Sequence, residues 1–228
     1  MTAAVRSVPG FLPTIAGFHF ANRWPAGPVL LLGARLGGPV PVGLEVRIGD
    51  AANGLCGGMA LATLDRWARG EPPPPDREPP PPGSPLFREI VRRQIDSLEL
   101  GRAIVRFYRA AAVGERGRAQ IAVREAWPAV RRQIDAGHPA GLGLVHVASA
   151  DPRRLIGDHQ VVAYGYELDP AARTLSLSIY DPNHPDDDSL RLRLTVVEPG
   201  GGRIECSYVP GEAAVLGLVP LGGPRIPG

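Results

Sequence analysis

The second half of the chain carries the pattern that most limits its fold, because strand candidates follow one another there without an intervening helix. There are six of them: 141–147, 160–166, 174–180, 190–196, 204–209 and 214–219. Turn sequences such as Asp169-Pro170 separate them. Strands in direct succession pair as antiparallel neighbours. We therefore predict an antiparallel sheet or partly open barrel over residues 137–228.

The preceding part of the chain has a helical pattern. Apolar residues recur at helical spacing from Met59 to Arg69, and Gly70 then provides a stop signal. Further helical patterns occupy 86–98, 104–108 and 121–135, with a new helix or a kink at Pro128. We assign residues 51–136 to a helical lobe, and the predicted fold class is α+β.

Residues 1–50 precede the helical lobe. Prolines and scattered aromatic residues over 1–27 predict an irregular segment that its aromatics hold against a core. Val29–Leu32 and Val42–Ile48 are strand candidates. Within the helical lobe, residues 71–85 form a proline-rich loop, either a spacer at the rim of a cleft or a ligand for proline-binding modules. We treat 1–228 as one domain built from these parts.

The composition excludes several classes of protein. The chain has 228 residues, of which 44% are hydrophobic, and its net charge of +2 argues against a nucleic-acid partner. Its 25 cationic residues are all arginine, and with 29 Gly and 26 Pro this indicates a GC-rich bacterial genome. We find no signal peptide at the N-terminus and no apolar run long enough for a membrane span, so we expect a cytoplasmic protein without a membrane partner.

The two cysteines differ in their surroundings. They lie 150 positions apart, which does not suggest a disulfide framework, and a reducing compartment is the simpler reading. Cys206 falls in a strand pattern and reads as a core thiol. Cys56 lies in Asn53-Gly54-Leu55-Cys56-Gly57-Gly58-Met59, directly ahead of a helix. Free N–H groups and the helix dipole favour a thiolate there, so Cys56 is a candidate nucleophile.

A nucleophilic cysteine needs a base, and the base needs an orienting group. His159 lies at the start of one predicted strand, and Asp181 lies at the end of the next. If these strands form a hairpin, antiparallel pairing brings the two residues together. We therefore predict that His159 and Asp181 lie side by side.

Three short motifs carry a resemblance to a known fold. Gly54-Leu55-Cys56-Gly57-Gly58, Gly157-Asp158-His159-Gln160 and Tyr180-Asp181-Pro182-Asn183 occur in that order. The arrangement resembles the papain-like cysteine peptidases, and is especially similar to the branch that processes double-glycine leader peptides of bacteriocins. The resemblance implies a cysteine at a helix start facing a β lobe. It implies Cys56 as nucleophile, His159 as base and Asp181 as orienting group.

The oxyanion-binding side departs from that family's pattern. Papain-like enzymes usually carry a glutamine about six residues before the cysteine, whereas Asp50 stands here and cannot donate when ionised. Asn53, the backbone N–H of Cys56 and the more distant Asn22 are the alternative donors. We count Asn53 and Asn183 as oxyanion or supporting residues.

The expected function is hydrolysis of a peptide or amide by a Cys-His-Asp thiol enzyme, with a peptide or protein substrate and no cofactor. Two alternatives stay open: a papain-like binding module with impaired catalysis, and a transglutaminase-type acyl transferase. The acidic stretch 181–188 superficially suggests calcium, but it lacks the glycine and the glutamate of a calcium loop. Zinc on Cys56, His159 and Asp181 lacks the usual ligand spacing, so we expect no metal.

Overall fold

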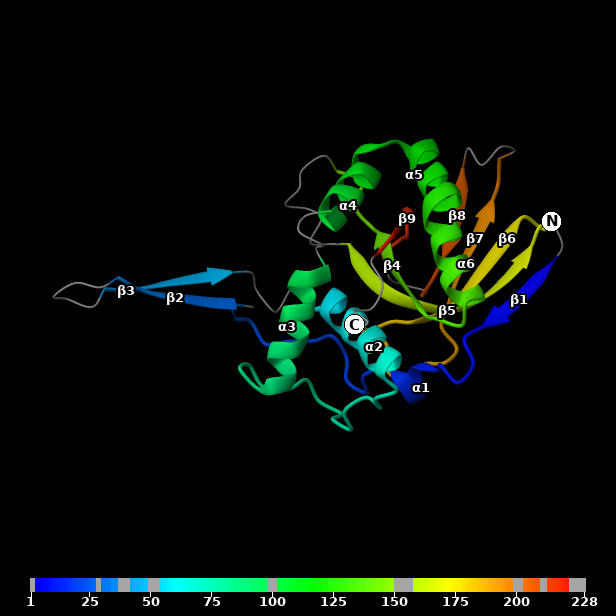
Figure 1. The fold of residues 1–228 in the computed structure, drawn as a ribbon. Helices are drawn as coiled ribbons and strands as arrows, with labels where there is room; N and C mark the ends of the chain where they lie inside the picture. Colours follow the sequence, from blue (N-terminus) through cyan, green and yellow to red (C-terminus); the bar gives the residue numbers. More distant parts are fainter. Residues whose placement is uncertain are drawn as a thin grey trace.

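The computed structural model describes residues 3–27, 30–36, 42–48, 54–97, 102–149, 158–198, 203–209 and 213–221. These residues form a mixed structure of helices and one large antiparallel sheet, as the predicted α+β class requires. Figure 1 shows the sheet curling into a half-barrel with helices packed against it. Within the described part of the chain, no helix is long and apolar enough to cross a membrane.

The large sheet has the strand order β8-β7-β6-β5-β4-β9, and β1 also pairs with β5. Its strands are β1 (Ala4–Ser7), β4 (Ala140–Val145), β5 (His159–Asp169), β6 (Thr174–Tyr180), β7 (Arg191–Val196), β8 (Ile204–Ser207) and β9 (Gly217–Pro220). All six predicted strands of the second half are present, with the predicted bounds for β6 and shifted ends for the other five. The last strand, β9, pairs with β4 and forms one edge of the sheet.

Strand β5 is the centre of this sheet. Its first half pairs with β4, where Leu144 faces His159, and its second half pairs with β1, where Ser7 faces Gly165. Residues 159–166 are all buried, so neighbouring chain covers both faces of the strand. A bulge between Ala163 and Gly165 interrupts its pairing with β6. His159 therefore starts a strand that is held on both sides.

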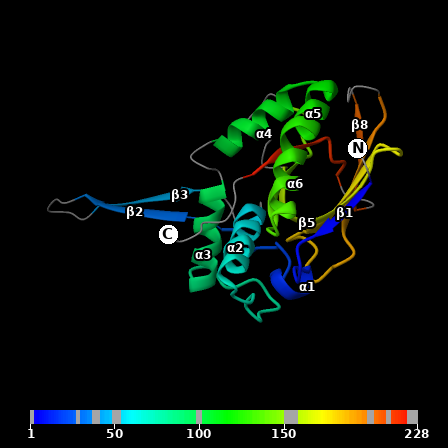
Figure 2. The same cartoon turned by 45° about the vertical axis from the view of Figure 1, so that its right-hand side comes forward.

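Helix α2 (Cys56–Arg69) packs between this sheet and a second helix, α3 (Pro85–Ser97), which lies beside it in both views (Figures 1 and 2). Leu61 and Leu64 belong to the same hydrophobic cluster as Val161 of β5. The Arg93 Nε of α3 contacts the Asp65 Oδ2 of α2 at 2.8 Å, and both side chains are buried. Gly70 ends α2 in the left-handed conformation, as its stop signal predicts.

The remaining helices cover another part of the sheet. They are α4 (Arg102–Ala112), α5 (Glu115–Ile121), a π-helical turn (Ala122–Ala126) and α6 (Trp127–Asp135). The π-turn joins α5 and α6 into one continuous helical run, and Pro128 is the second residue of α6, directly after the wider π-turn. The predicted new helix or kink at Pro128 is therefore found only as a change of hydrogen-bonding pattern beside it, within one uninterrupted run.

The N-terminal segment is more regular than the sequence predicted. Residues 1–27 were expected to be irregular, but β1 pairs with β5 and α1 (Pro13–Ala16) forms a single helical turn that begins with proline. Proline disfavours the interior of a helix, not its first position. The expectation that aromatic residues anchor the segment is confirmed, because Phe18, Phe20 and Trp24 pack against α2 and α3.

Strands β2 (Leu30–Leu36) and β3 (Val42–Ile48) pair with each other as a separate antiparallel hairpin. The bounds of β3 are those predicted, whereas β2 extends four residues beyond the predicted end at Leu32. Figure 1 shows this hairpin extending away from the large sheet. The proline-rich segment 71–84 has no helix or strand, as predicted.

Candidate active site

Three elements bring Cys56, His159 and Asp181 to one place. Cys56 is the first residue of α2, His159 is the first residue of β5, and Asp181 follows the last residue of β6. The register of β5 and β6 pairs Val162 with Tyr180, so the start of one strand lies beside the end of the other. Helix α2 begins at Cys56 itself, three residues earlier than its apolar pattern suggested.

The predicted contact between His159 and Asp181 is present. The His159 Nε2 lies 2.7 Å from the Asp181 Oδ1, and the Cys56 side chain lies near enough to the His159 ring to raise its pKa. Because Nε2 faces Asp181, Nδ1 is the nitrogen that remains for Cys56. An ionised carboxylate only accepts, so Nε2 carries a proton. The three side chains therefore lie in order from a buried carboxylate, through the imidazole, to a partly exposed thiol.

The charges of these three side chains shift the pKa values of His159 and Asp181. Burial alone lowers the pKa of His159, but the negative charges of Cys56 and Asp181 and their hydrogen bonds outweigh it, and the pKa is raised well above its usual value. Burial likewise raises the pKa of Asp181, but the His159 charge and three hydrogen bonds outweigh it, so this pKa is lowered. Both shifts therefore favour a protonated His159 beside an ionised Asp181.

Asp181 is held by more than the histidine. It is completely buried, its Oδ1 accepts the backbone N–H of Asn183 at 2.7 Å, and its Oδ2 accepts the hydroxyl of Tyr208. Tyr208 follows β8, which lies two strands away from β6 in the sheet. Three donors therefore fix one carboxylate, which fixes the histidine ring in turn. Asn183, predicted as a supporting residue, contributes its main chain to this arrangement.

The start of α2 offers unused donors. Among the described residues, the backbone N–H groups of Cys56 and Gly57 have no protein acceptor, whereas Gly58 donates to Gln94 Oε1 at 2.7 Å. The first turn of α2 contains no acidic residue, so nothing there offsets the positive end of the helix dipole. These N–H groups can donate to an anion beside the Cys56 sulfur. Asp50 and Asn53 lie outside the described residues.

Asn22 connects three parts of this site. Its Oδ1 accepts the backbone N–H of Leu55 at 2.6 Å and the indole N–H of Trp24 at 2.8 Å. Two donors on one atom identify it as the amide oxygen, so the opposite atom is the NH₂ group. That Nδ2 donates to the Asn183 Oδ1 at 3.2 Å. Asn22 therefore ties the residue before Cys56 to the loop that carries Asp181.

Glycines allow the close approach of these segments. Gly54 has φ +86°, and a Cβ there would lie 2.7 Å from the Nδ2 of Asn22. A Cβ on Gly58 would lie 2.2 Å from the carbonyl oxygen of Ile90 in α3. A Cβ on Gly57 would lie 2.7 Å from the Nε2 of Gln160, the residue after His159. The glycines on both sides of Cys56 therefore permit the packing around it.

The acidic loop between β6 and β7 uses its carboxylates within the protein. Asp186 binds His19 Nδ1 and Arg77 Nη1, each at 2.6 Å, which ties the proline-rich loop to the segment after Asp181. Asp187 accepts from Ser189, and Asp188 accepts from Thr14. Within the described part of the chain, no group of three potential ligands is arranged to hold a metal ion.

Cys206 differs from Cys56 in its electrostatics. It lies in β8 opposite Leu194, and burial raises the pKa of its thiol to about 12. It has no base beside it among the described residues, and the two cysteines are both free. Cys206 was predicted as a core thiol, and it is partly buried and packs against the main hydrophobic cluster.

Sequence reasoning missed several residues around the site. Tyr208 reaches it from just after β8 and Gln94 from α3, and no local pattern marks either. Gln160 adjoins His159, but its contact with Ser97 of α3 depends on helix packing. Asn22 was considered only as a distant oxyanion donor, and its observed contacts are with Leu55, Trp24 and Asn183. No protein-family model, no curated protein and no solved structure matches this chain.

Proposed function

We propose that this protein is a papain-like thiol hydrolase that cleaves a peptide or amide bond through an acyl-enzyme. The observation that carries the proposal is the arrangement of Cys56 beside His159 and of His159 hydrogen-bonded to Asp181, with the cysteine at a helix start and the aspartate fully buried. A nucleophile, a base and an orienting group in contact are the parts that such catalysis needs. The papain-like assignment rests on the three motifs and on this geometry.

The proposed reaction proceeds in two steps. The Cys56 sulfur attacks the carbonyl carbon of the substrate, forming a C–S bond, and the N–H groups of Cys56 and Gly57 donate to the oxyanion. The His159 Nδ1 gives its proton to the leaving nitrogen as the C–N bond breaks. Water then attacks the thioester and gives a proton to His159. The C–S bond breaks, which releases the carboxylic acid and restores the thiolate.

The direct test is turnover of a peptide-amide library by the wild type and two variants. Cys56→Ala removes the nucleophile and is expected to abolish cleavage of every substrate found, whereas Cys206→Ala is expected to retain it. Mass spectrometry that finds Cys56 modified by one acyl group, compared with the unmodified protein, would support the acyl-enzyme. Unchanged cleavage by Cys56→Ala contradicts the proposal.

An acyl transferase would use the same acyl-enzyme. The difference lies in the second step, where an amine takes the place of water. Adding a primary amine to the library reaction distinguishes the two, because a transferase forms the amide product and a hydrolase forms the acid.

A further inference from the structure

A cavity lies at the opposite end of strand β5 from His159. It has a volume of about 520 Å³ and lies between the π-turn and α6 on one side and the far ends of β5 to β8 on the other. His159 starts β5, whereas Leu168 and Asp169 at its end border this cavity. Ten residues of strand separate them, about 33 Å along the chain at the usual rise. The cavity is therefore separate from the proposed active site.

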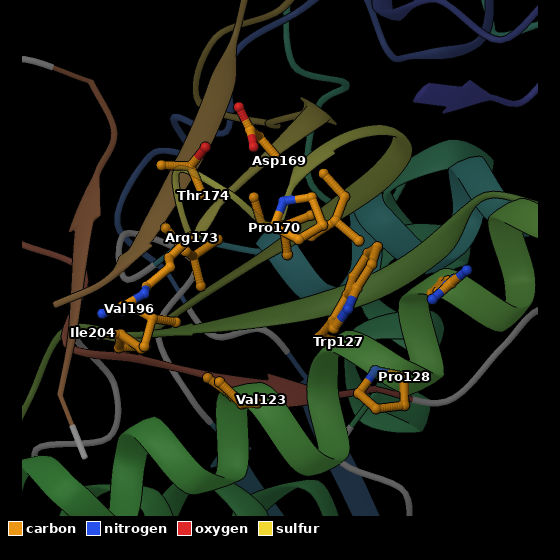
Figure 3. A pocket seen from close by; sticks show the side chains of 14 residues that line it. Val123, Trp127, Pro128, Asp169, Pro170, Arg173, Thr174, Val196 and Ile204 are labelled. Carbon is orange, nitrogen blue, oxygen red and sulfur yellow. The ribbon is translucent and has the colours of Figure 1, made fainter. Parts of the chain in front are cut away.

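The walls of the cavity are largely apolar. Figure 3 shows Trp127 and Pro170 facing each other on one side, with Val123, Val196 and Ile204 across from them. Val123 belongs to the π-turn and is 38% exposed. Turns of this type occur often at functional sites, because they displace side chains from the regular helical positions. The volume is in the range of small-molecule pockets, and an apolar ligand would exclude water from these walls.

The ionisable groups at the cavity differ in whether another group of the protein already binds them. Asp169 accepts the backbone N–H groups of Ala171 and Ala172, so its carboxylate holds the turn between β5 and β6. Arg131 binds Asp135 at 3.2 Å. Within the described chain, the guanidinium of Arg173 has no carboxylate partner, and its backbone has φ +55°, which only a minority of residues other than glycine adopt.

We propose that this cavity binds a small amphipathic anion, an apolar chain that ends in a carboxylate. The apolar walls receive the chain, and Arg173 receives the carboxylate at the rim, where Figure 3 shows its side chain beside Val196 and Ile204. A cationic ligand would have only Asp169 as a counter-charge, and the turn already occupies that group. A guanidinium suits a carboxylate because it can donate two parallel hydrogen bonds.

The test is calorimetric titration of the full chain with decanoate, and with 1-decanol and decylamine as probes of equal chain length. We expect decanoate to bind at least about tenfold more tightly than either, since a charge-assisted hydrogen bond contributes on this scale. Equal affinity for the three probes, or no decanoate binding below its micelle concentration, overturns the proposal.

Three variants identify the site. Arg173→Gln is expected to remove the preference for decanoate over decanol, and Val123→Glu to abolish decanoate binding, because it places a carboxylate in the apolar wall. Arg193→Gln removes the same charge from an exposed position on β7 outside this cavity and is expected to bind as the wild type does. If Arg173→Gln keeps the preference, or Val123→Glu still binds, the assignment is wrong.

The result does not depend on the proposed enzyme activity. Cys56→Ala is expected to bind decanoate with the same affinity as the wild type, because the two sites are at opposite ends of β5. Circular dichroism of each variant establishes that it is folded before titration. Loss of binding in Cys56→Ala would place the ligand at the thiol and contradict the second site.

Discussion

At the scale of single residues, Asp181 is the most constrained group in the candidate site. Burial would disfavour its charge, yet hydrogen bonds from His159, Asn183 and Tyr208 keep it ionised. Removing one member of a buried charged network leaves the others unpaired. The carboxylate therefore stabilises the fold as well as the orientation of the histidine ring.

Asp181→Ala is expected to lower the free energy of unfolding by about 3–5 kcal/mol, as for other broken buried pairs. The control is Asp187→Ala in the same loop, where the carboxylate accepts from Ser189 and the residue is only partly buried. That variant should lose about 1 kcal/mol or less. Urea unfolding measures both, and equal losses would show that Asp181 is not a special anchor.

Two substitutions of Asn22 separate its roles as a hydrogen-bond acceptor and as a donor. Asn22→Asp keeps an oxygen for the Leu55 and Trp24 N–H groups but cannot donate to Asn183, whereas Asn22→Leu loses both. We expect Asn22→Leu to lower the free energy of unfolding by about 1–3 kcal/mol and to slow alkylation of Cys56. We expect Asn22→Asp to retain most of the stability and most of the alkylation rate. Thermal unfolding and alkylation rates check this. If Asp is as damaging as Leu, the link to Asn183 dominates.

The residues that the sequence could identify are those beside ordered local patterns. Cys56 precedes a helical repeat, and His159 and Asp181 flank two adjacent strands, so their proximity follows from pairing alone. Asn22 and Tyr208 reach the site through long-range packing, which leaves no local periodic signal. Their positions needed the structure.

At the scale of elements, the start of α2 depends on how closely α3 can approach it. Gly58→Ala would place a methyl group against the Ile90 carbonyl oxygen, and a backbone atom cannot move aside as a flexible side chain can. We expect a loss of about 1–3 kcal/mol, typical of overpacking. Gly27→Ala is the control, because no atom lies within 4 Å of its Cβ position. Chemical denaturation measures the two, and similar losses would contradict the tight packing.

Elements with a strong local pattern were predicted best. The alternation of β3 and β6 gave both strands their observed bounds, and Gly70 gave the end of α2. Strand β1 and helix α1 were missed because four residues are too few for a periodic signal, and because β1 forms only by pairing with β5, more than 150 residues away. Such an element depends on tertiary contacts.

At the scale of the whole molecule, the two shifted titrations make stability depend on pH. A raised pKa of His159 adds stability that is complete below about pH 6.5, its unfolded value, and is lost as pH rises through the folded pKa. A lowered pKa of Asp181 adds stability above about pH 4 that is lost as pH falls through its folded pKa. Their joint contribution is greatest between these limits.

The difference in unfolding free energy between the wild type and His159→Ala should therefore be largest between about pH 4 and pH 6.5. It should decrease at more acidic and at more alkaline pH. Denaturation curves at several pH values, with His138→Ala as the control at a surface loop, measure the difference. A difference that does not change with pH would show that the ion pair contributes nothing to folding.

The central claim is that His159 activates Cys56, and the rate of iodoacetamide alkylation at pH 6, mapped by mass spectrometry, tests it most directly. We predict that Cys56 reacts at least about tenfold faster than glutathione, because a neighbouring histidine activates the sulfur as a nucleophile. We further predict that His159→Ala removes this advantage and that Cys206 stays unmodified. A Cys56 rate equal to that of glutathione, no change in His159→Ala, or preferential modification of Cys206 would contradict the account.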